Sequence, residues 1–517
     1  MRLLAFAQPA LLASSAFWGT SAALAIREAD QLRVKTTSGT LIGKYNATNV
    51  RAFLGVPYAY PPIGTRRFAA PVPYDVSADK VQNVTSFGYT CPGQYYPGTS
   101  IYTQLPFLPF TEQNEDCLKL NVWAPTEERI KAKGGKLPVL VFVPGGYFTQ
   151  GGSAAGSTDA TNLVSDNDVI VVTMNYRLSV FGFPNFGNAR NLGLLDQRVA
   201  LEWARNNAAK FGGDSSRITL LGQSAGGISA DAHMFAKWNA TPGDPLHDAA
   251  PIPHAVGILS GGVLLDIYST DKNQTQFGQL GAAVGCTASK NLLKCMRSVP
   301  AETLLNEIVA NGTAWGWNFA PIPDEQLVFS NYTERILSGK MSKVPTFFSS
   351  LENETTGLVP FDPQGNINTT LAYDQMLKLF ICPTSMNSRL RVQAGVPTYR
   401  MRYGGNFTNI SPYPFLGTYH GAELPMIFGG ATPEFGGRNS TTEESRTAGL
   451  LQSIIVSFAT DPKNGLGDMG WPAYNPENDT IVVVSPPAVP KLESAGMPGW
   501  PQMMLDSSIR YDAPCNS

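Results

Sequence analysis

The stretch "LLGQSAGGIS" (residues 220–229) places Ser224 between Gly222 and Gly226, directly after a run of apolar residues. A serine on a tight turn from a strand into a helix stands exposed, and small residues on either side let the two elements pack closely, so the arrangement is typical of a nucleophile. The chain has 50 glycines, and a glycine-rich turn with a helix-capping serine fits the pattern equally well. The motif therefore indicates a nucleophile only if a base and an acid accompany it.

A histidine is the side chain best suited to take the serine proton at neutral pH. The chain has four histidines. Where a serine stands on a strand-to-helix turn of this kind, the acid comes between the serine and the histidine in the chain. Only His420, in the loop sequence "LGTYHGAELP", leaves room for such an acid. For His233, His247 and His254 we expect hydrogen-bonded structural roles.

The acid is expected in a loop that follows an intervening strand, where it can accept the second imidazole N–H and stabilise the imidazolium. The segment "VPTFFSSLENETTG" (344–357) offers two candidates, Glu352 and Glu354. At least one of them is expected to be an ordinary surface glutamate after the strand. The spacing of the residues alone does not choose between the two.

A carbonyl oxygen that becomes negatively charged needs backbone N–H donors, and the loss of one such donor typically costs about 3–4 kcal/mol. One donor is expected at Ala225, the residue after the serine, and the others in a glycine-rich turn after an earlier strand. The segment "LVFVPGGYFTQGG" (140–152) has that character. Together these features predict acyl transfer through a serine.

Apolar runs along the chain predict the strands that must position these residues. Continuous apolarity, rather than alternation, is typical of strands that are covered on both faces in a parallel sheet. Between the second and third runs, Leu195, Val199 and Trp203 fall on one helical face, and Gly212 and Gly213 end the helix. Strand, helix and strand in this order predict an α/β fold. The predicted strands are 137–143, 169–176, 218–222, 255–260, 344–350 and 398–403.

The charge balance argues against nucleic acid and anionic membranes as partners. The chain of 517 residues has 38 Lys and Arg against 40 Asp and Glu, a net charge of −2, which leaves no basic surface of the kind that such partners require. No repeat, low-complexity block or linker is evident, and an α/β fold can use this length as one domain.

The N-terminal residues 1–25 have the pattern of a secretory signal peptide, with an arginine, an apolar stretch and the small-residue ending Ala23-Leu24-Ala25. A buried first helix is the alternative. No later run is long enough to span a bilayer, and the tail "YDAPCNS" has neither an anchor nor a retention signal. We therefore expect a secreted, extracellular protein without a membrane anchor.

Cysteines and glycosylation sequons agree with export. The chain has six cysteines, an even number that suits an oxidising compartment. It also has twelve Asn-x-Ser/Thr sequons, whose asparagines can carry glycans on surface loops. We expect glycans among the following eight: Asn46, Asn83, Asn239, Asn273, Asn311, Asn331, Asn406 and Asn478.

Several long segments give a more specific signal than the serine turn, because they occur together in one order. The chain resembles the type-B carboxylesterases, the cholinesterase and carboxylesterase/lipase family of α/β-hydrolases. This resemblance implies a central, mostly parallel sheet flanked by helices. The segments are "VRAFLGVPYAYPPIGTRRFAAP" (50–71), "EDCLKLNVWAP" (115–125), "NYRLSVFGF" (175–183), "NLGLLDQRVALEWARNNAAKFGGD" (191–214), "ITLLGQSAGG" (218–227), "YHGAELPMIFG" (419–429) and "WPAY" (471–474).

The resemblance also implies roles for individual residues. Ser224 becomes the nucleophile, His420 the general base and Glu354, rather than Glu352, the acid. The implied oxyanion hole consists of the N–H groups of Gly146, Tyr147 and Ala225. Six cysteines allow fifteen pairings, and the family pattern implies Cys91–Cys117, Cys286–Cys295 and Cys382–Cys515.

The chain departs from the family pattern in four places. Pro144 to Tyr147 replace the usual His-Gly-Gly-Gly, and Gln223 replaces the usual glutamate before the serine. The stretch from Glu354 to His420 is short, which predicts a partly trimmed helical cap. The segment between Cys91 and Cys117 has no tryptophan, the ring that best holds a quaternary ammonium. This argues against choline esters, although three residues could partly substitute: Tyr95, Tyr96 and Phe107.

These observations predict a signal peptide at 1–25 and a single catalytic domain at 26–517. We expect a secreted serine carboxylic-ester hydrolase that acts on a small-molecule or lipid ester and needs no cofactor and no metal. The oligomeric state and the natural ester stay open. Two alternatives remain, namely a lipase or sterol-ester hydrolase with the apolar segment "YTQLPFLPF" (102–110) as a lid, and a non-catalytic adhesion or binding protein.

Overall fold

A computed structural model describes most of the chain. The described residues are 31–94, 101–103, 112–236, 252–287, 291–362, 364–429, 440–478, 480–485, 503–506 and 511–516. The expected signal peptide at 1–25 and most of the expected lid lie outside them. So do four single residues named above, Tyr95, Tyr96, Phe107 and His247, and the sequon at Asn239.

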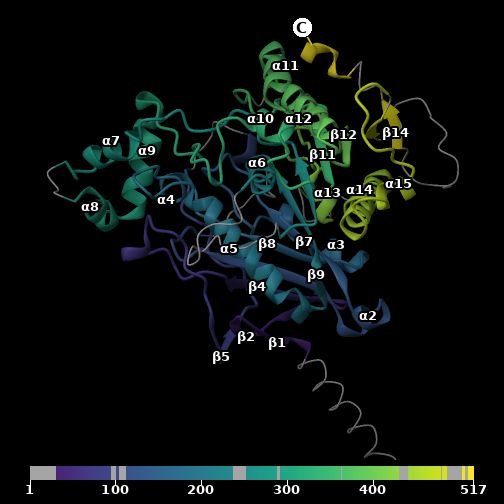
Figure 1. The fold of residues 1–517 in the computed structure, drawn as a ribbon, viewed down its shortest axis with the longest axis horizontal. Coiled ribbons are helices and arrows are strands. Elements are labelled where there is room, and N and C mark those ends of the chain that lie inside the picture. Colours follow the sequence, from purple (N-terminus) through teal and green to yellow (C-terminus); the bar gives the residue numbers. More distant parts are fainter. Residues whose placement is uncertain are drawn as a thin grey trace, which may run out of the picture.

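A sheet of eleven strands forms the centre of the molecule (Figure 1). Its strands from β8 to β13 run parallel, whereas β6, β4, β3 and β14 add antiparallel edges. The expectation of a mostly parallel sheet is confirmed. In spatial order the strands are β14 (Met503–Asp506), β13 (Ile481–Val484), β12 (Thr398–Tyr403), β11 (Thr346–Leu351), β10 (Ala255–Leu259), β9 (Gly213–Gln223), β7 (Leu137–Val143), β8 (Ile170–Met174), β6 (Lys119–Pro125), β4 (Val50–Pro57) and β3 (Lys44–Ala47).

A second, three-stranded sheet is built from the N-terminal part of the described chain, which is purple in Figure 1. In it β2 (Ser38–Ile42) pairs antiparallel with β1 (Arg33–Thr36) and parallel with β5 (Val76–Asn83). The side-chain hydroxyl of Ser38 accepts a hydrogen bond from Trp203 Nε1 at 2.8 Å. The small sheet is therefore tied to a helix that packs on the large one.

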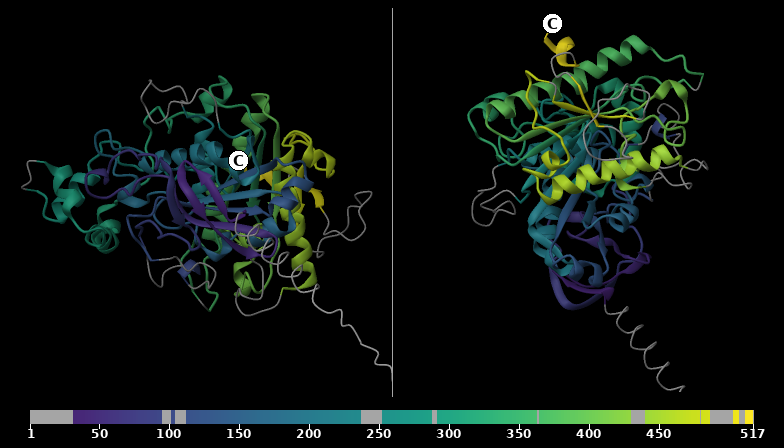
Figure 2. Two further views of the ribbon diagram at one scale, coloured as in Figure 1. Left: turned by 90° about the horizontal axis from the view of Figure 1, so that it is seen from below. Right: turned by 90° about the vertical axis from the view of Figure 1, so that its right-hand side faces the viewer.

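Helices cover both faces of the large sheet (Figures 1 and 2). Alternate residues of β7 show the two faces, because Val139 and Val141 share a core with Trp203 of α5, while Leu140 shares another with Ile454 of α14. The helices are α2 (Glu127–Ala132), α3 (Thr161–Asp166), α4 (Ser179–Gly182), α5 (Leu192–Asn207), α6 (Ala225–His233), α7 (Gln276–Ala283), α8 (Leu292–Ser298), α9 (Ala301–Trp315), α10 (Tyr332–Leu337), α11 (Thr369–Met376), α12 (Cys382–Gln393), α13 (Leu424–Phe428), α14 (Thr442–Thr460) and α15 (Gly465–Asp468).

The helices α7, α8 and α9 lie together at one end of the molecule, and α14 and α15 lie at the other (Figures 1 and 2). The first group has a core of its own, to which Phe277, Met296 and Ile308 belong. In the described part of the chain, no helix combines the length and the apolar character that crossing a membrane would require.

The six cysteines are joined as Cys91–Cys117, Cys286–Cys295 and Cys382–Cys515, which are the pairs that the resemblance implies. The last pair ties the C-terminal segment to the start of α12. A buried cluster strengthens that attachment, because Asp512 accepts hydrogen bonds from Arg400 Nη1 at 2.7 Å and Ser385 Oγ at 2.6 Å.

Candidate active site

Ser224 lies between the end of β9 and the start of α6, as the motif predicts. Its backbone angles are φ 57° and ψ −125°, a conformation that costs a non-glycine residue about 1–3 kcal/mol and that clusters at active sites. Backbone hydrogen bonds hold it there, since Ser224 N–H donates to Leu259 O at 2.8 Å and Ser224 O accepts from Ile228 N–H at 2.9 Å. The turn is thus a rigid platform at the carboxyl ends of β9 and β10.

The two glycines of the motif are required by the close approach of β9, α6 and β7. A Cβ atom at Gly222 would lie 2.0 Å from Gly226 O, and one at Gly226 would lie 2.0 Å from Val143 O. Both contacts are with backbone, which cannot move aside cheaply. The spacing around Ser224 therefore reflects packing of the serine turn against the neighbouring strand.

His420 and Glu354 form a buried pair. His420 Nδ1 lies 2.7 Å from Glu354 Oε2, with 7% of the histidine and 0% of the glutamate exposed. The other carboxylate oxygen, Oε1, accepts a hydrogen bond from Leu351 N–H at 2.9 Å. A backbone bond from His420 N–H to Glu354 O at 3.3 Å ties the two loops together as well.

Glu352, the other candidate acid, lies elsewhere. Its Oε1 accepts a hydrogen bond from Arg402 Nη2 at 2.7 Å, and about a third of its side chain is exposed. Of the two glutamates, Glu354 and not Glu352 contacts the imidazole.

Two aromatic residues position the histidine. Tyr102 O–H donates to the backbone O of His420 at 2.7 Å, and the Phe380 ring packs against the imidazole with ring centroids 4.8 Å apart. Phe380 belongs to a π-helical turn, η5 (Leu377–Ile381), between α11 and α12, and such turns frequently occur at functional sites. Neither contact has a signature in the sequence alone.

Gln223 contacts the free edge of the imidazole. Its side-chain Nε2 lies 3.1 Å from His420 Nε2, and Gln223 is only 5% exposed. Within the described chain, no hydrogen bond joins His420 Nε2 to Ser224 Oγ. Catalytic hydrogen bonds are often longer in free enzymes and tighten when substrate binds.

The glycine-rich turn after β7 packs closely against the serine turn. A Cβ atom at Gly145 would be 2.9 Å from Ser224 Cβ and 2.7 Å from Gln223 O. The next three residues, Gly146, Tyr147 and Phe148, have φ values of 112°, 58° and 61°. Such a run of positive φ turns the backbone sharply toward the serine turn, while the Tyr147 side chain is 51% exposed.

The other described histidines have structural surroundings, as expected. His233 is buried with Nε2 3.0 Å from Gln197 Oε1, and burial, helped by the Arg198 charge, lowers the pKa of His233 to about 3. His254 Nδ1 contacts Ile218 O at 2.9 Å, and burial lowers its pKa too.

Glu423 is a buried carboxylate near the site that the sequence reasoning missed. It is 0% exposed, and neither carboxylate oxygen has a hydrogen-bond partner in another described residue. Burial and the neighbouring charge of Glu354 raise the pKa of Glu423 to about 8. At neutral pH Glu423 is therefore mostly protonated, and Glu354 has no second negative charge beside it.

Replacing Glu423 with glutamine is expected to stabilise the protein at pH 8 but hardly at pH 4.5. Between these values the unfolded chain has released the proton that the folded state keeps, so the contribution of Glu423 to stability falls as pH rises through this window. At 1.36 kcal/mol per pKa unit, Glu423→Gln is expected to raise the free energy of unfolding at pH 8 by up to about 4 kcal/mol. Thermal unfolding at both pH values measures it, with Glu352→Gln as control. An equal change in Tm at both pH values would contradict the assignment.

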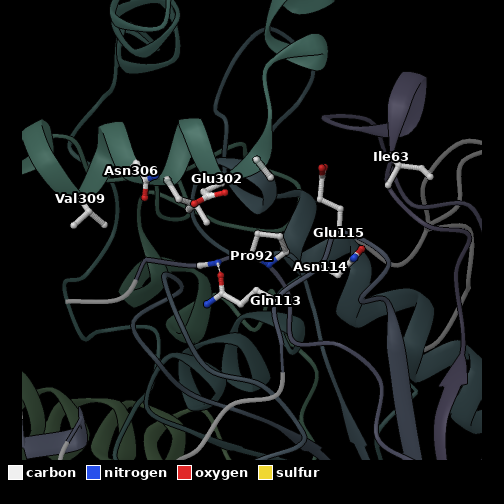
Figure 3. A pocket seen from close by; sticks show the side chains of 11 residues that line it. Ile63, Pro92, Gln113, Asn114, Glu115, Glu302, Asn306 and Val309 are labelled. Carbon is white, nitrogen blue, oxygen red and sulfur yellow. Dashed lines mark hydrogen bonds between the residues drawn. The ribbon is translucent and has the colours of Figure 1, made fainter. Parts of the chain in front are cut away.

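A separate cavity of about 550 Å³ lies between the two ends of the Cys91–Cys117 segment and α9 (Figure 3). Figure 3 shows Glu302, Asn306 and Val309 of α9 on one side of it. None of Ser224, Glu354 and His420 lines it. The cavity is therefore distinct from the serine turn.

Most of the eight expected glycosylation sites are accessible. The side chains of Asn46 and Asn311 are partly buried, and each donates a hydrogen bond, to Thr161 Oγ1 and Glu307 Oε1 respectively. The exposed asparagines are Asn83, Asn273, Asn331, Asn406 and Asn478.

Asn353, in a sequon whose middle residue is Glu354, is expected to stay unmodified. Its Oδ1 accepts a hydrogen bond from Thr418 N–H at 3.0 Å, and it lies so close to Gly417 that a Cβ there would be 2.2 Å from Oδ1. A glycan needs an exposed asparagine. Glycopeptide mass spectrometry of active protein measures how fully each asparagine carries a glycan, with the exposed Asn83 as the positive control. Full occupancy of Asn353 would contradict the placement of Glu354.

Comparisons with known proteins show what this chain is similar to. Residues 30–378 match the family model described as the carboxylesterase family. The chain is 38% identical over 493 residues to "Secreted lipase 5" of Gibberella zeae, covering 87% of this chain and 90% of the relative. It is 37% identical over 488 residues to "Chlorogenic acid esterase" of Aspergillus niger, covering 90% and 92%. It is 28% identical over 489 residues to "Para-nitrobenzyl esterase" of Bacillus subtilis, covering 86% and 94%.

Proposed function

Because the chain belongs to the carboxylesterase family and is a carboxylic ester hydrolase, we propose that Ser224, His420 and Glu354 carry out the hydrolysis of uncharged carboxylic esters. The observation that carries this proposal is the buried His420–Glu354 pair beside the strained serine turn. The non-catalytic alternative is disfavoured, because a binding protein has no need of a nucleophile, a base and an acid held together.

The proposed reaction has two half-reactions. Ser224 Oγ attacks the ester carbonyl while its proton passes to His420 Nε2, and the Nδ1–H of the resulting imidazolium stays bonded to Glu354. The N–H groups of Gly146, Tyr147 and Ala225 stabilise the oxyanion. The proton on Nε2 then passes to the departing alcohol, and water, activated by the same nitrogen, releases the acid from the acyl-enzyme.

The preference for uncharged esters rests on Gln223. A carboxylate at this position would attract a cationic alcohol group through the Coulomb interaction, which is strong in a site with little water. An amide has no net charge and offers no such attraction. Together with the lack of tryptophan between Cys91 and Cys117, this disfavours choline esters.

A panel of substrates tests the proposal. Short-chain p-nitrophenyl esters are expected to turn over readily, and an acylcholine with the same acyl group is expected to have a kcat/KM at least about tenfold lower, the factor that 1.4 kcal/mol of lost attraction represents. A preference for the acylcholine would contradict the proposed substrate class.

The lipase alternative is kept because several relatives are named lipases, among them "Secreted lipase 5". A short-chain triglyceride such as tributyrin, added to the panel below and above its solubility limit, separates the two. A jump in rate at the oil–water interface would favour the lipase, whereas saturation below the solubility limit supports an esterase.

Tyr147 is expected to exclude bulky alcohol groups. It replaces a glycine of the family pattern in the turn above Ser224, so its side chain narrows the space beside the reacting carbonyl. Esters of tertiary alcohols should react much more slowly than those of primary alcohols. Tyr147→Gly should lower the ratio of the primary-ester rate to the tertiary-ester rate about tenfold or more, which corresponds to some 1.4 kcal/mol of relieved crowding. The ratio of kcat/KM for tert-butyl and n-butyl acetate measures this. An unchanged ratio would remove Tyr147 from the determinants of specificity.

We also propose that residues 1–25 are removed on export and that residues 26–517 form one secreted catalytic domain. The three disulfides suit an oxidising compartment, and one relative is named a secreted lipase. One large sheet, from β3 near the N-terminus to β14 near the C-terminus, supports the single domain. N-terminal sequencing of the exported protein tests the cleavage after Ala25.

A further inference from the structure

The side chain of Gln223 lies between the two parts of the site that must act together. On one side its Nε2 contacts His420 Nε2 at 3.1 Å. On the other side its Oε1 lies against the glycine-rich turn after β7, since a Cβ atom at Gly145 would be 2.7 Å from it. Gln223 directly precedes Ser224 and is the last residue of β9, so its backbone cannot shift without moving the nucleophile.

The hydrogen-bond network determines which atom donates in this contact. Glu354 accepts at Nδ1, so the resting imidazole carries its proton on Nδ1 and presents a lone pair at Nε2. A side-chain amide nitrogen is a donor only. Gln223 therefore donates to the lone pair that, in the proposed mechanism, receives the proton of Ser224.

We propose that Gln223 is a positioning residue for His420: its amide N–H holds the neutral imidazole in the resting enzyme, and its carbonyl oxygen accepts from Nε2–H once the imidazole is protonated. The inference rests on the proposed triad. A lone pair accepts one strong hydrogen bond, so Ser224 O–H and Gln223 N–H compete for Nε2. When the serine proton has moved to Nε2, an amide N–H facing it becomes repulsive and the amide must turn.

The site has room for that turn. Rotation of the terminal amide exchanges Oε1 and Nε2, and such terminal torsions are broad and roughly two-fold. Oε1 now faces the Cα of Gly145, where any larger residue would block it, and Nε2 faces Gly421, whose Cβ would be 3.7 Å away. Glycines thus lie beside both ends of the amide, where a larger residue would hinder the exchange.

Gln223 contacts the imidazole at Nε2 and carries no charge. Glu354 contacts Nδ1, and Tyr102 donates to the histidine backbone. Glu423 and Tyr511 interact electrostatically with Glu354 from α13 and the C-terminal segment. Burial raises the pKa of each of these three above its ordinary value, so Tyr102, Glu423 and Tyr511 are neutral at pH 5–7. Between pH 5 and 7, the titration of these three groups therefore does not mask the effect of a substitution at residue 223 on His420.

Two near-isosteric variants test the proposal through the pH dependence of kcat/KM for p-nitrophenyl acetate. In Gln223→Glu the side chain can only accept, and its negative charge near Nε2 favours the imidazolium, so the midpoint of the acidic limb is expected to rise by about one pH unit or more. Gln223→Met keeps the bulk but neither donates nor accepts. Its kcat/KM on the alkaline plateau is expected to fall about three- to tenfold, the usual effect of one lost hydrogen bond, with a smaller rise of the midpoint.

Gln197→Met is the matched control, because Gln197 makes the other described glutamine–histidine contact, with His233. It loses two buried hydrogen bonds, with His233 and with Ser229 Oγ, neither of which involves Ser224, Glu354 or His420. The midpoint should therefore stay unchanged. If the midpoints of Gln223→Glu and wild type coincide within 0.2 units, roughly the precision of such a fit, or if Gln223→Met matches wild type in rate and midpoint, the role of Gln223 is overturned. Failure of the triad itself would appear separately, as hydrolysis that survives Ser224→Ala. Should Gln223→Glu not fold, Gln223→Met still decides.

Discussion

Replacing Ser224 with alanine is expected to reduce kcat by about a million-fold, with folding intact, because it removes the nucleophile of a unit whose members act together. His420→Ala should come close to the same loss, since without the base the serine oxygen keeps its proton. Rates with p-nitrophenyl acetate and thermal unfolding of each variant measure these effects.

Ser229→Ala is the matched control for this experiment. Ser229 lies on α6, and its hydroxyl donates to Ala225 O at 2.8 Å. It also accepts a hydrogen bond from Gln197 Nε2 at 3.1 Å. The variant therefore loses two hydrogen bonds, each worth about 1 kcal/mol of stability, and no reacting atom. If Ser224→Ala retained more than about one hundredth of the wild-type rate, far above the residual rate of a disabled triad, another nucleophile would have to be sought.

Glu354→Gln is expected to lower kcat by about ten-thousand-fold, while Glu352→Gln should change it by no more than a few-fold. An amide at position 354 can donate to Nδ1 and so favours the tautomer with the proton on Nε2, which cannot serve as a base. Glu352 instead pairs with Arg402 near the surface, and such exposed pairs contribute about 0–1 kcal/mol to stability. Steady-state kinetics of both variants at pH 8 measure the difference.

The pair of substitutions is informative because both change one carboxylate to an amide within three residues. If Glu352→Gln proved more damaging than Glu354→Gln, the acid would be assigned to the wrong residue. Equal, small effects would mean that the imidazole is oriented by its other contacts, with Tyr102 and Phe380.

The sequence predicts the centre of the sheet better than its edges. The six runs all coincide with strands, β7 to β12, and five of them are mainly apolar because strands covered on both faces bury most of their side chains. The exception is β12 (TYRMRY), which contains two arginines. The strand β5, by contrast, has the sequence VSADKVQN and is largely exposed. β13 has only four residues, IVVV. Pairing with neighbours, rather than composition, decides whether such segments become strands.

The site divides in a similar way. Ser224 and His420 could be predicted from motif, chain order and chemistry, but the choice of Glu354 over Glu352 needed the family resemblance. The structure shows a physical reason: β11 ends at Leu351, whose N–H binds Glu354 Oε1, so the chain turns back and Glu354 points inward. The sequence does contain a hint that Glu423 is buried, because an acidic residue within the apolar stretch "AELPMIF" suggests a buried carboxylate.

The turn from Gly146 to Phe148 has a consequence for how this protein can change. Two of its three residues with positive φ, Tyr147 and Phe148, are not glycine, and a non-glycine residue held in this region costs about 1–3 kcal/mol. The fold is therefore less stable than it could be at the turn that holds the proposed oxyanion donors and the Tyr147 side chain. A lineage that restored glycine at position 147 would relieve that strain and accept bulkier esters, so selection for stability and selection for selectivity act in opposite directions at this one residue.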